Sequence, residues 1–211
     1  MSTIYGSNNK KTFLELQKLN QGKINGNNAM LFLSDDRYDV YKVHTWDEFK
    51  FPRKKYHTYL GITENKTKTF DPDNLNPSLH VQWIVSCCGK VTNKDEIIDN
   101  SDKSMSDSIA QTHAIVALLD YVYDQSDYID SKVISEALSM VEGKYAAWIH
   151  NCENGNVFIA KCNYELYADV YENTFSSKPM KGLEPLQDGE LYQLTREGIT
   201  PVSFFDCSDD Q

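Results

Sequence analysis

Segments with strand-like and helix-like hydrophobic periods follow one another in an order that restricts the possible folds. From Gly143 onward, apolar residues recur at every second position in short segments separated by turn signals such as Asn154-Gly155. Residues 79–91 have the same two-residue period. Between these two regions, residues 109–122 and 131–143 carry apolar residues at helical spacing. Strands on both sides of a helical pair predict an α+β fold in which helices cover two stacked, mainly antiparallel sheets.

The amino-terminal region adds a strand, a helix and a hairpin to this pattern. The segment "MSTIYG" precedes an expected helix over residues 12–22, where Thr12 and Glu15 have the spacing of a capping box. Two apolar segments on either side of residues 34–37 predict a β-hairpin. Residues 63–78 are rich in Asn, Asp, Thr and Pro and predict a loop.

Charge and hydropathy exclude two classes of ligand. The 211 residues carry a formal net charge of -10 at pH 7. Nucleic-acid binding relies on clustered Lys and Arg, so no nucleic-acid partner is expected. No apolar run reaches about 18 residues and no charged-then-apolar leader is present, so neither a membrane span nor a secretory signal is predicted. The expected location is the cytoplasm, which for a viral protein means the host cytoplasm or the virion.

The cysteines give no sign of a metal or redox site. Cys87, Cys88, Cys152, Cys162 and Cys207 are odd in number and lack C-x-x-C spacing. This pattern predicts reduced thiols, no metal and no cofactor. We interpret the adjacent pair at a strand end as two small buried side chains rather than as a redox or metal pair.

Short segments throughout the chain match, in order, the motifs of one enzyme family. They are "MSTIYG" at the start, "TYLGIT" at 58–63, "NLNP" at 74–77, "CCGKVTN" at 87–93, "MVEGKYAAWI" at 140–149, "TFSSKP" at 174–179 and "LQDGELYQL" at 186–194. In this order the chain resembles the class II glutamine amidotransferase domain, an N-terminal-nucleophile (Ntn) hydrolase. The resemblance implies a four-layer αββα sandwich over residues 1–200, with residues 201–211 forming the end of the last strand and an acidic tail.

The resemblance also implies where a catalytic site lies. In the family, the side chain of the first residue attacks the side-chain amide of glutamine, and its free α-amine acts as the base. This position falls on Ser2, which becomes the first residue only when Met1 is removed. The resemblance assigns the backbone donor of the oxyanion hole to Gly89. It assigns the side-chain donor, an Asn in the family, to Cys88, whose S–H is a poor donor.

The positions that hold glutamine in the family are neutral here. The strand Arg that pairs with the substrate carboxylate corresponds to about Leu60, and the Asp that holds the substrate amine corresponds to about Gln111. The turn Arg and Asp correspond to about Asn25 and Asn28. A leucine cannot replace a bidentate guanidinium, so free glutamine is not the expected substrate.

Two classes of function therefore stay open. In the first, the domain has lost glutaminase activity and acts as a binding or structural protein that binds another protein or itself. The Asn-, Lys-, Asp- and Tyr-rich composition suggests an A/T-rich genome and a bacteriophage accessory or virion-associated protein. In the second, an active Ntn amidohydrolase uses Ser2 on an unidentified amide, with Gly89 in its oxyanion hole.

Other conspicuous residues have ordinary interpretations. His57, His80 and His113 have no Asp or Glu at metal-ligand spacing and are interpreted as surface or core histidines. The aromatic stretch around Trp46, which includes the basic residues 53–55, has two readings: a partner-binding surface or a solvated loop.

Overall fold

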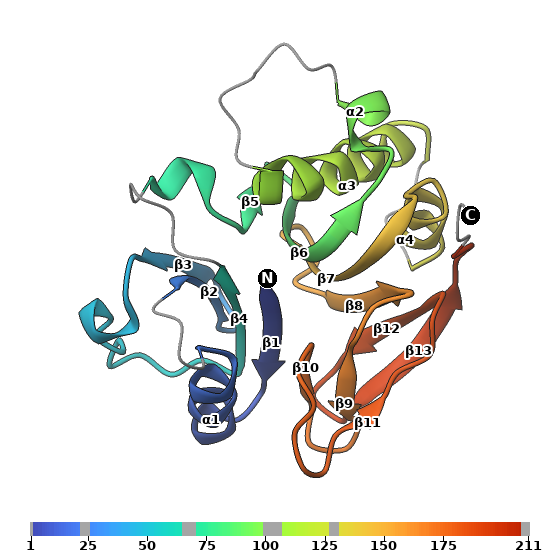
Figure 1. The fold of residues 1–211 in the computed structure, drawn as a ribbon. Coiled ribbons are helices and arrows are strands. Elements are labelled where there is room, and N and C mark those ends of the chain that lie inside the picture. Colours follow the sequence, from blue (N-terminus) through green and yellow to red (C-terminus); the bar gives the residue numbers. More distant parts are fainter. Residues whose placement is uncertain (1, 22–25, 65–70, 99–106, 127–130, 208–211) are drawn as a thin grey trace.

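Two antiparallel sheets face each other in the computed structural model, which describes residues 2–21, 26–64, 71–98, 107–126 and 131–207 (Figure 1). Sheet A has the strand order β11-β9-β10-β1-β4-β2-β3, and sheet B has the order β13-β12-β8-β7-β6-β5. Sheet A consists of β1 (Thr3–Ser7), β2 (Asn27–Leu33), β3 (Tyr38–Val43), β4 (Thr58–Glu64), β9 (Tyr167–Asp169), β10 (Thr174–Ser176) and β11 (Glu184–Pro185). Sheet B consists of β5 (Ser78–Leu79), β6 (Trp83–Val91), β7 (Gly143–Asn151), β8 (Val157–Cys162), β12 (Glu190–Leu194) and β13 (Ile199–Phe204).

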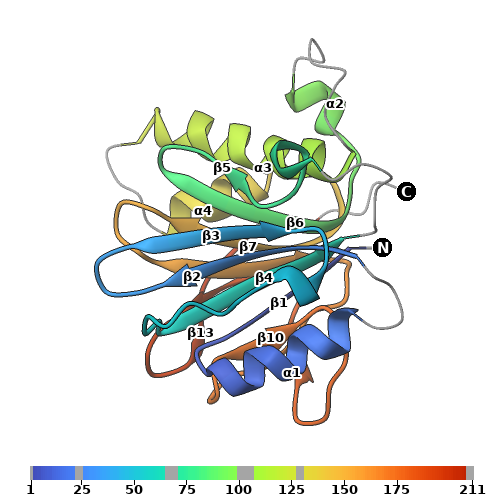
Figure 2. The ribbon, with the colours of Figure 1, turned by 90° about the vertical axis from the view of Figure 1, so that its left-hand side faces the viewer.

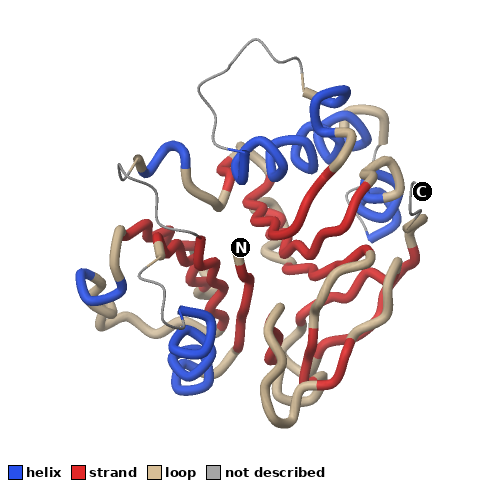
Figure 3. Tube along the Cα trace, viewed as in Figure 1, coloured by secondary structure: helices blue, strands red, loops and turns tan. Residues whose placement is uncertain are grey.

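Helices cover the outer face of each sheet. Helix α1 (Lys10–Gln21) packs on sheet A, and helices α3 (Asp107–Tyr123) and α4 (Ser131–Leu138) pack on sheet B (Figures 2 and 3). The short helix α2 (Lys94–Ile97) follows β6, and two 3-10 turns, η1 (Trp46–Glu48) and η2 (Pro72–Asn74), lie in the connections. This arrangement confirms the expected α+β fold with αββα layers.

Three apolar clusters hold these layers together. Because side chains alternate along a strand, β6 directs Trp83 and Val85 toward α3 and α4 and directs Ile84 into the space between the sheets. The intersheet cluster also contains Ile4 of β1 and Leu60 of β4. The third cluster lies on the outer face of sheet A. The interface between the two sheets is therefore a packed core into which β1 and β6 both contribute.

The third cluster explains the aromatic stretch around Trp46. Phe49 and Phe51 pack against Phe32 on the outer face of sheet A, and Trp46 packs against Phe49 and Phe51. These rings are partly buried against the third cluster, so the stretch is not a solvated loop, and partner binding by it stays a prediction.

Helix α1 begins two residues earlier than the sequence predicts. The side chain of Asn9 caps it: its Oδ1 accepts from the amides of Lys11 at 2.9 Å and Thr12 at 3.2 Å. Asparagine is among the strongest N-cap residues, so the Thr12–Glu15 capping box was the wrong start signal. The expected end at Gly22 lies outside the described residues.

The strand expected over 79–91 is divided. Residues 78–79 form β5, and β6 starts at Trp83 and continues beyond Gly89 to Val91. Between them the chain turns, with the amide of His80 donating to the Trp83 carbonyl at 2.8 Å. Val81 lies in this turn, outside both strands, and is 95% exposed.

The carboxyl-terminal strands do not form one meander. Strands β7, β8, β12 and β13 belong to sheet B, whereas β9, β10 and β11 cross to sheet A, where β10 pairs with β1. A two-residue period identifies strands but does not say which sheet they join. The crossing matters for the site because it brings Ser176 and Ser177 alongside the start of β1.

The cysteines depart from the expectation of five reduced thiols. Cys162 and Cys207 form a disulfide across a sequence separation of 45 residues. Cys87 and Cys88 are buried free thiols, as the sequence predicted, and Cys152 is a partly buried free thiol. Among the described residues, no cluster of His, Cys, Asp and Glu is arranged to hold a metal ion. No described helix has the length and apolar character needed to cross a membrane.

Candidate functional site

Strand β1 places Ser2 at the border of the intersheet core. The strand lies inside sheet A, paired with β4 from Thr3↔Thr63 onward and with β10. Ile4 points into the intersheet cluster, so the alternation of an extended chain directs Ser2, two residues earlier, to the same side. Ser2 is partly buried there. This is the position to which the family resemblance assigns the nucleophile.

Cys88 lies across from the start of β1. Its thiol lies beside the side chains of Ser177 and Tyr164 and the backbone of Ile4. Ser177 ties the same region to β1, because its Oγ accepts from the Ile4 amide at 3.0 Å and its own amide donates to the Ile4 carbonyl at 2.9 Å. Burial raises the pKa of the Cys88 thiol to about 12, so it stays protonated near neutral pH. The structure therefore brings Cys88 close to the nucleophile position as a neutral group.

Gly89 has a structural reason to be glycine. Its φ of +111° lies in the region that side chains rarely adopt. A Cβ at this position would lie 2.2 Å from the carbonyl oxygen of Lys144 and 2.8 Å from the Cα of Tyr145, both on β7. The close approach of β6 and β7 therefore accounts for this residue whether or not its amide takes part in chemistry.

Leu60 and Gln111 are structural residues. Leu60 is fully buried in the intersheet cluster and pairs with Gly6, four residues along β1 from Ser2. Gln111 fastens α3 to the end of β6: its Oε1 accepts from the Val91 amide at 3.1 Å and its Nε2 donates to Asp107 at 3.1 Å. Leu60 offers no polar group, and the side-chain amide of Gln111 is engaged by Val91 and Asp107.

Asn28 also belongs to the framework of sheet A. Its Nδ2 donates to the Gly26 carbonyl at 2.7 Å, and its Oδ1 accepts from the hydroxyl of Thr63 at 3.0 Å. The Thr63 hydroxyl in turn meets the hydroxyl of Tyr5 at 3.3 Å. Asn25 lies outside the described residues.

The residue that sequence reasoning missed is Glu64. Extending the β1–β4 register by one position sets Ser2 opposite Glu64, which is only 7% exposed. Its Oε1 accepts from Nδ2 of Asn76 at 2.6 Å, and the hydroxyl of Thr112 donates to Oδ1 of Asn76 at 2.5 Å. The "NLNP" segment contains Asn76, but Glu64 fell in an expected loop, so no signal in the sequence marked it.

Lys42 lies near enough to Glu64 for the two charges to interact. Burial lowers the pKa of Lys42, and the carboxylate of Glu64 opposes that shift. The ammonium group donates to the carbonyls of Pro72 at 2.9 Å and Leu75 at 2.6 Å. The ammonium group therefore holds the connection that precedes β5 in place.

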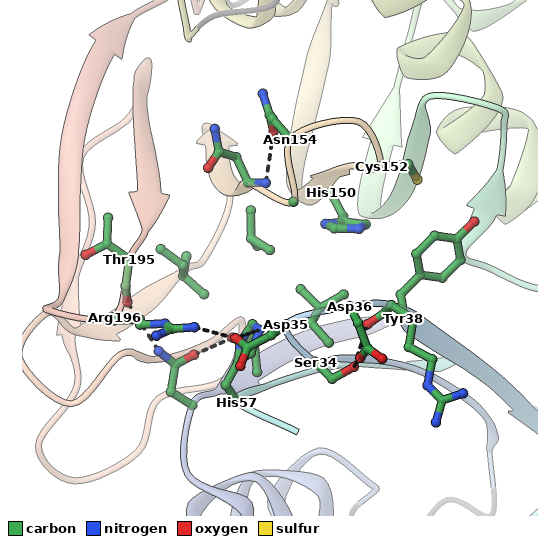
Figure 4. A pocket seen from close by; sticks show the side chains of 18 of the residues that line it. Ser34, Asp35, Asp36, Tyr38, His57, His150, Cys152, Asn154, Thr195 and Arg196 are labelled. Carbon is green, nitrogen blue, oxygen red and sulfur yellow. Dashed lines mark hydrogen bonds and ion pairs between the residues drawn. The ribbon is translucent and has the colours of Figure 1, made fainter. Parts of the chain in front are cut away.

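A cavity of about 1000 Å³ lies at the other end of β1. It is bordered by Asn8, the β2–β3 hairpin, the start of β4 and the β7–β8 and β12–β13 turns, as Figure 4 shows. Ser2, Cys88 and Gly89 do not line it. This cavity and the Ser2 position are therefore separate places.

The fold, but not the sequence, has known counterparts. No protein-family model matches the sequence, and no curated protein matches it. Among solved structures, glutamine phosphoribosylpyrophosphate amidotransferase from B. subtilis matches with a TM-score of 0.70 and 14% identity, over 99% of this chain and 50% of its own. An allosteric regulatory enzyme of purine biosynthesis matches with a TM-score of 0.71 and 14% identity, over 100% of this chain and 50% of its own.

A third structure is similar over its whole length. A glutamine aminotransferase class-II domain protein from Silicibacter pomeroyi has a TM-score of 0.51 and 12% identity, over 98% of this chain and 100% of its own. The chain thus spans half the length of the first two structures and all of this one. It has the Ntn-hydrolase-like fold of glutamine amidotransferase type-2 domains.

Proposed function

We propose that this chain is a glutamine amidotransferase type-2-like domain that does not hydrolyse glutamine and acts by binding, either to another protein or to a second copy of itself. The observation that carries the proposal is the buried carboxylate of Glu64 opposite the Ser2 position. A glutamine whose side-chain amide lies at Ser2 carries its own carboxylate a few bonds away, and two carboxylates repel each other where water is excluded. The position that the family resemblance gives to the carboxylate-binding arginine is Leu60, which is apolar and supplies no positive charge.

The groups needed for attack on an amide support the same proposal. A serine hydroxyl is far less ionised near neutral pH than the family's thiol. The Cys88 thiol replaces an amide donor with a weak one, and loss of one oxyanion donor costs roughly 100- to 1,000-fold in rate. These losses affect the transition state, whereas Glu64 affects binding of the substrate.

A second candidate function is an Ntn amidohydrolase that uses Ser2 on an amide lacking a carboxylate. The observation in its favour is the position of Ser2, which faces the intersheet space beside Cys88 and Gly89. Such a substrate would avoid the repulsion from Glu64. This function requires a free α-amine on Ser2, and hence removal of Met1.

The partner and the location are also part of the proposal. The net charge of -10 argues against nucleic acid, so we infer a protein partner or self-association. A bacteriophage accessory or virion-associated role agrees with the composition. The Cys162–Cys207 disulfide favours the virion over the reducing host cytoplasm, because disulfides persist mainly in oxidising surroundings.

The experiment compares wild type with Ser2→Ala for release of ammonia from glutamine and from a panel of neutral amides. Ser203→Ala is the matched control, since Ser203 lies partly exposed on the edge strand β13. Mass spectrometry of the amino terminus accompanies the assay. The proposal expects no ammonia above background from any of the three proteins. Release that Ser2→Ala abolishes and Ser203→Ala retains establishes the amidohydrolase instead.

A further inference from the structure

The layer that covers the outer face of sheet A is basic in an acidic chain. It consists of α1, residues 44–56 and residues 178–183, whose apolar side chains form the third cluster or pack against it. These segments contain nine Lys and Arg and three Asp and Glu, a net charge of +6, whereas the whole chain has a net charge of -10. Asp39 of the neighbouring β3 offsets one of these charges, with Oδ2 3.9 Å from Nζ of Lys54. We call these segments the basic layer.

Several charges of the basic layer are not neutralised within the chain. Lys50, Arg53 and Lys55 are exposed, and among the described residues no carboxylate forms an ion pair with any of them. Lys10 of α1 lies beside this stretch, because its Nζ is 4.2 Å from the centroid of the Phe51 ring. The basic layer therefore presents a continuous region of unpaired positive charge.

The layer that covers sheet B has the opposite charge. This acidic layer consists of α3 and α4 with the turns that follow them, residues 107–126 and 131–142. These residues include five Asp and Glu and one Lys, a net charge of -4. Asp124 and Glu136 are exposed, and no cation in the described part of the chain forms an ion pair with either. The two charged layers lie on opposite sides of the paired sheets (Figure 2).

Both layers also expose large apolar side chains among their charges. Trp46, Phe49 and Phe51 are partly exposed in the basic layer. In the acidic layer, Tyr121 is 55% exposed and Met140 is 45% exposed. Aromatic residues, Met and Arg are the side chains that protein–protein interfaces favour. The two layers therefore have the composition of protein-binding surfaces.

Charge complementarity makes a second copy of this chain the occupant that satisfies both layers. Two basic layers repel each other, so a two-fold dimer through this surface is disfavoured. A nucleic acid or an anionic membrane would contact the basic layer but would leave the acidic layer without a partner. At physiological ionic strength the Debye length is about 8 Å, so the net charge of -10 on each copy does not prevent a local contact between unlike layers.

We propose that copies of this chain associate head to tail, with the basic layer of one copy against the acidic layer of the next. Such a contact is heterologous, so it builds chains or rings and does not stop at a closed dimer. The inference rests on the self-association alternative of the proposed function and deepens it by naming the two surfaces. It involves neither Ser2 nor glutamine.

Sedimentation velocity of the purified full-length chain measures this association. The protein concentration is raised from about 10 µM to about 1 mM, the range in which weak contacts become populated. In about 0.15 M NaCl we expect the average mass to rise with concentration and to pass that of a dimer. In about 1 M NaCl, where the Debye length is about 3 Å, we expect the association to weaken at least tenfold.

Two charge-reversal variants identify the surfaces. Arg53→Glu with Lys55→Glu alters the basic layer alone, and Asp124→Lys with Glu136→Lys alters the acidic layer alone. Each variant is expected to associate about tenfold more weakly than wild type, because like charges then face each other. An equimolar mixture of the two is expected to associate again, because the unchanged acidic layer of the first variant meets the unchanged basic layer of the second.

Lys90→Glu with Lys144→Glu is the matched control. These two exposed lysines pair across β6 and β7, outside both layers, and their reversal changes the net charge by the same amount as that of Arg53 and Lys55. The control should associate as wild type does. Circular dichroism of every variant verifies that the fold is retained, which the exposure of all the altered side chains favours.

Several results would overturn the proposal. They are a wild-type protein that stays monomeric or stops at a dimer up to about 1 mM, layer variants that associate as tightly as wild type, and a mixture that associates no better than either variant alone. A monomeric wild type that binds single-stranded oligothymidine or phosphatidylserine vesicles would assign the basic layer to another partner. None of these readouts measures ammonia release, so failure here is distinguishable from failure of the proposed loss of glutaminase activity.

Discussion

Leu60 shows at the scale of one residue what the intersheet core can accommodate. It occupies the position that the family resemblance gives to an arginine, and it is fully buried among apolar side chains. Leu60→Arg therefore does not restore a binding site but buries an unpaired charge. We expect a loss of about 3 to 5 kcal/mol in the free energy of unfolding, measured by urea denaturation.

The control for this substitution is Leu60→Met, which conserves volume and apolar character. It should cost less than about 1.5 kcal/mol. A Leu60→Arg protein as stable as wild type would show that the side chain reaches a partner or solvent, and that the intersheet core is less closed than described.

His150 makes a second prediction at this scale, on pH. Burial lowers its pKa from 6.5 to about 4, so the unfolded chain takes up a proton at a higher pH than the folded chain does. The resulting stabilisation is complete above pH 6.5 and is lost as the pH falls toward 4. The shift corresponds to about 3 kcal/mol.

The check is urea denaturation of wild type and His150→Phe at a series of pH values across this window. Phenylalanine does not titrate, so the stability of the variant should fall by about 3 kcal/mol less than that of wild type. Identical pH profiles for the two proteins would mean that the imidazole is accessible to protons and water in the folded state.

At the scale of elements, the pairing of β6 with β7 depends on Gly89. Gly89→Ala combines an unfavourable φ with a Cβ placed 2.2 Å from a backbone oxygen of the neighbouring strand. Gly155→Ala has a similarly positive φ, but no atom lies within 4 Å of its Cβ. Gly155→Ala should therefore cost about 1 to 2 kcal/mol, the strain of the backbone alone, and Gly89→Ala clearly more.

Thermal denaturation of the two variants separates the cost of backbone strain from the cost of the close contact with β7. Equal destabilisation would show that β7 moves away at little cost and that close packing does not explain the glycine. That result would favour a catalytic role for the Gly89 amide.

The elements themselves were largely predictable, and their partners were not. Hydrophobic period identified the β2–β3 hairpin, helix α3 and the strands after Gly143, because burial of one face imposes that period locally. The crossing of β9 to β11 into sheet A depends on contacts between distant segments. Glu64 likewise lies opposite Ser2 because of the register between β1 and β4, and no local motif marks it.

At the scale of the whole molecule, the Cys162–Cys207 disulfide attaches the carboxyl-terminal segment to sheet B. It ties the segment after β13 to β8 across 45 residues. Replacing Cys207 by Ser should lower the free energy of unfolding by about 2 to 4 kcal/mol, because the unfolded chain regains the freedom of that loop. Cys152→Ser, which removes a free thiol, is the control in thermal denaturation without reductant. An unchanged melting temperature for Cys207→Ser would show that the thiols are not joined in the isolated protein.

The site was only partly predictable at the scale of the molecule. The order of elements predicted the αββα layers, and the family resemblance assigned a site to Ser2, Cys88 and Gly89, which stays a prediction. The cavity at the far end of β1 has no sequence motif, because its walls come from five separate turns and strand ends. His150 can be recognised as a cavity residue only once these segments are assembled.

Glutamine hydrolysis by a Ser2→Cys protein is the most direct test of the central claim. This substitution supplies the thiol nucleophile of the resembled family while leaving Glu64, Cys88 and Leu60 in place, and mass spectrometry confirms that Met1 is removed and the introduced cysteine is the first residue. We predict that ammonia release from glutamine stays at background, because the carboxylate of Glu64 and the weak oxyanion donor are unchanged. Ammonia release well above that of wild type would contradict the account, since it would mean that the glutamine site is intact and lacks only its nucleophile.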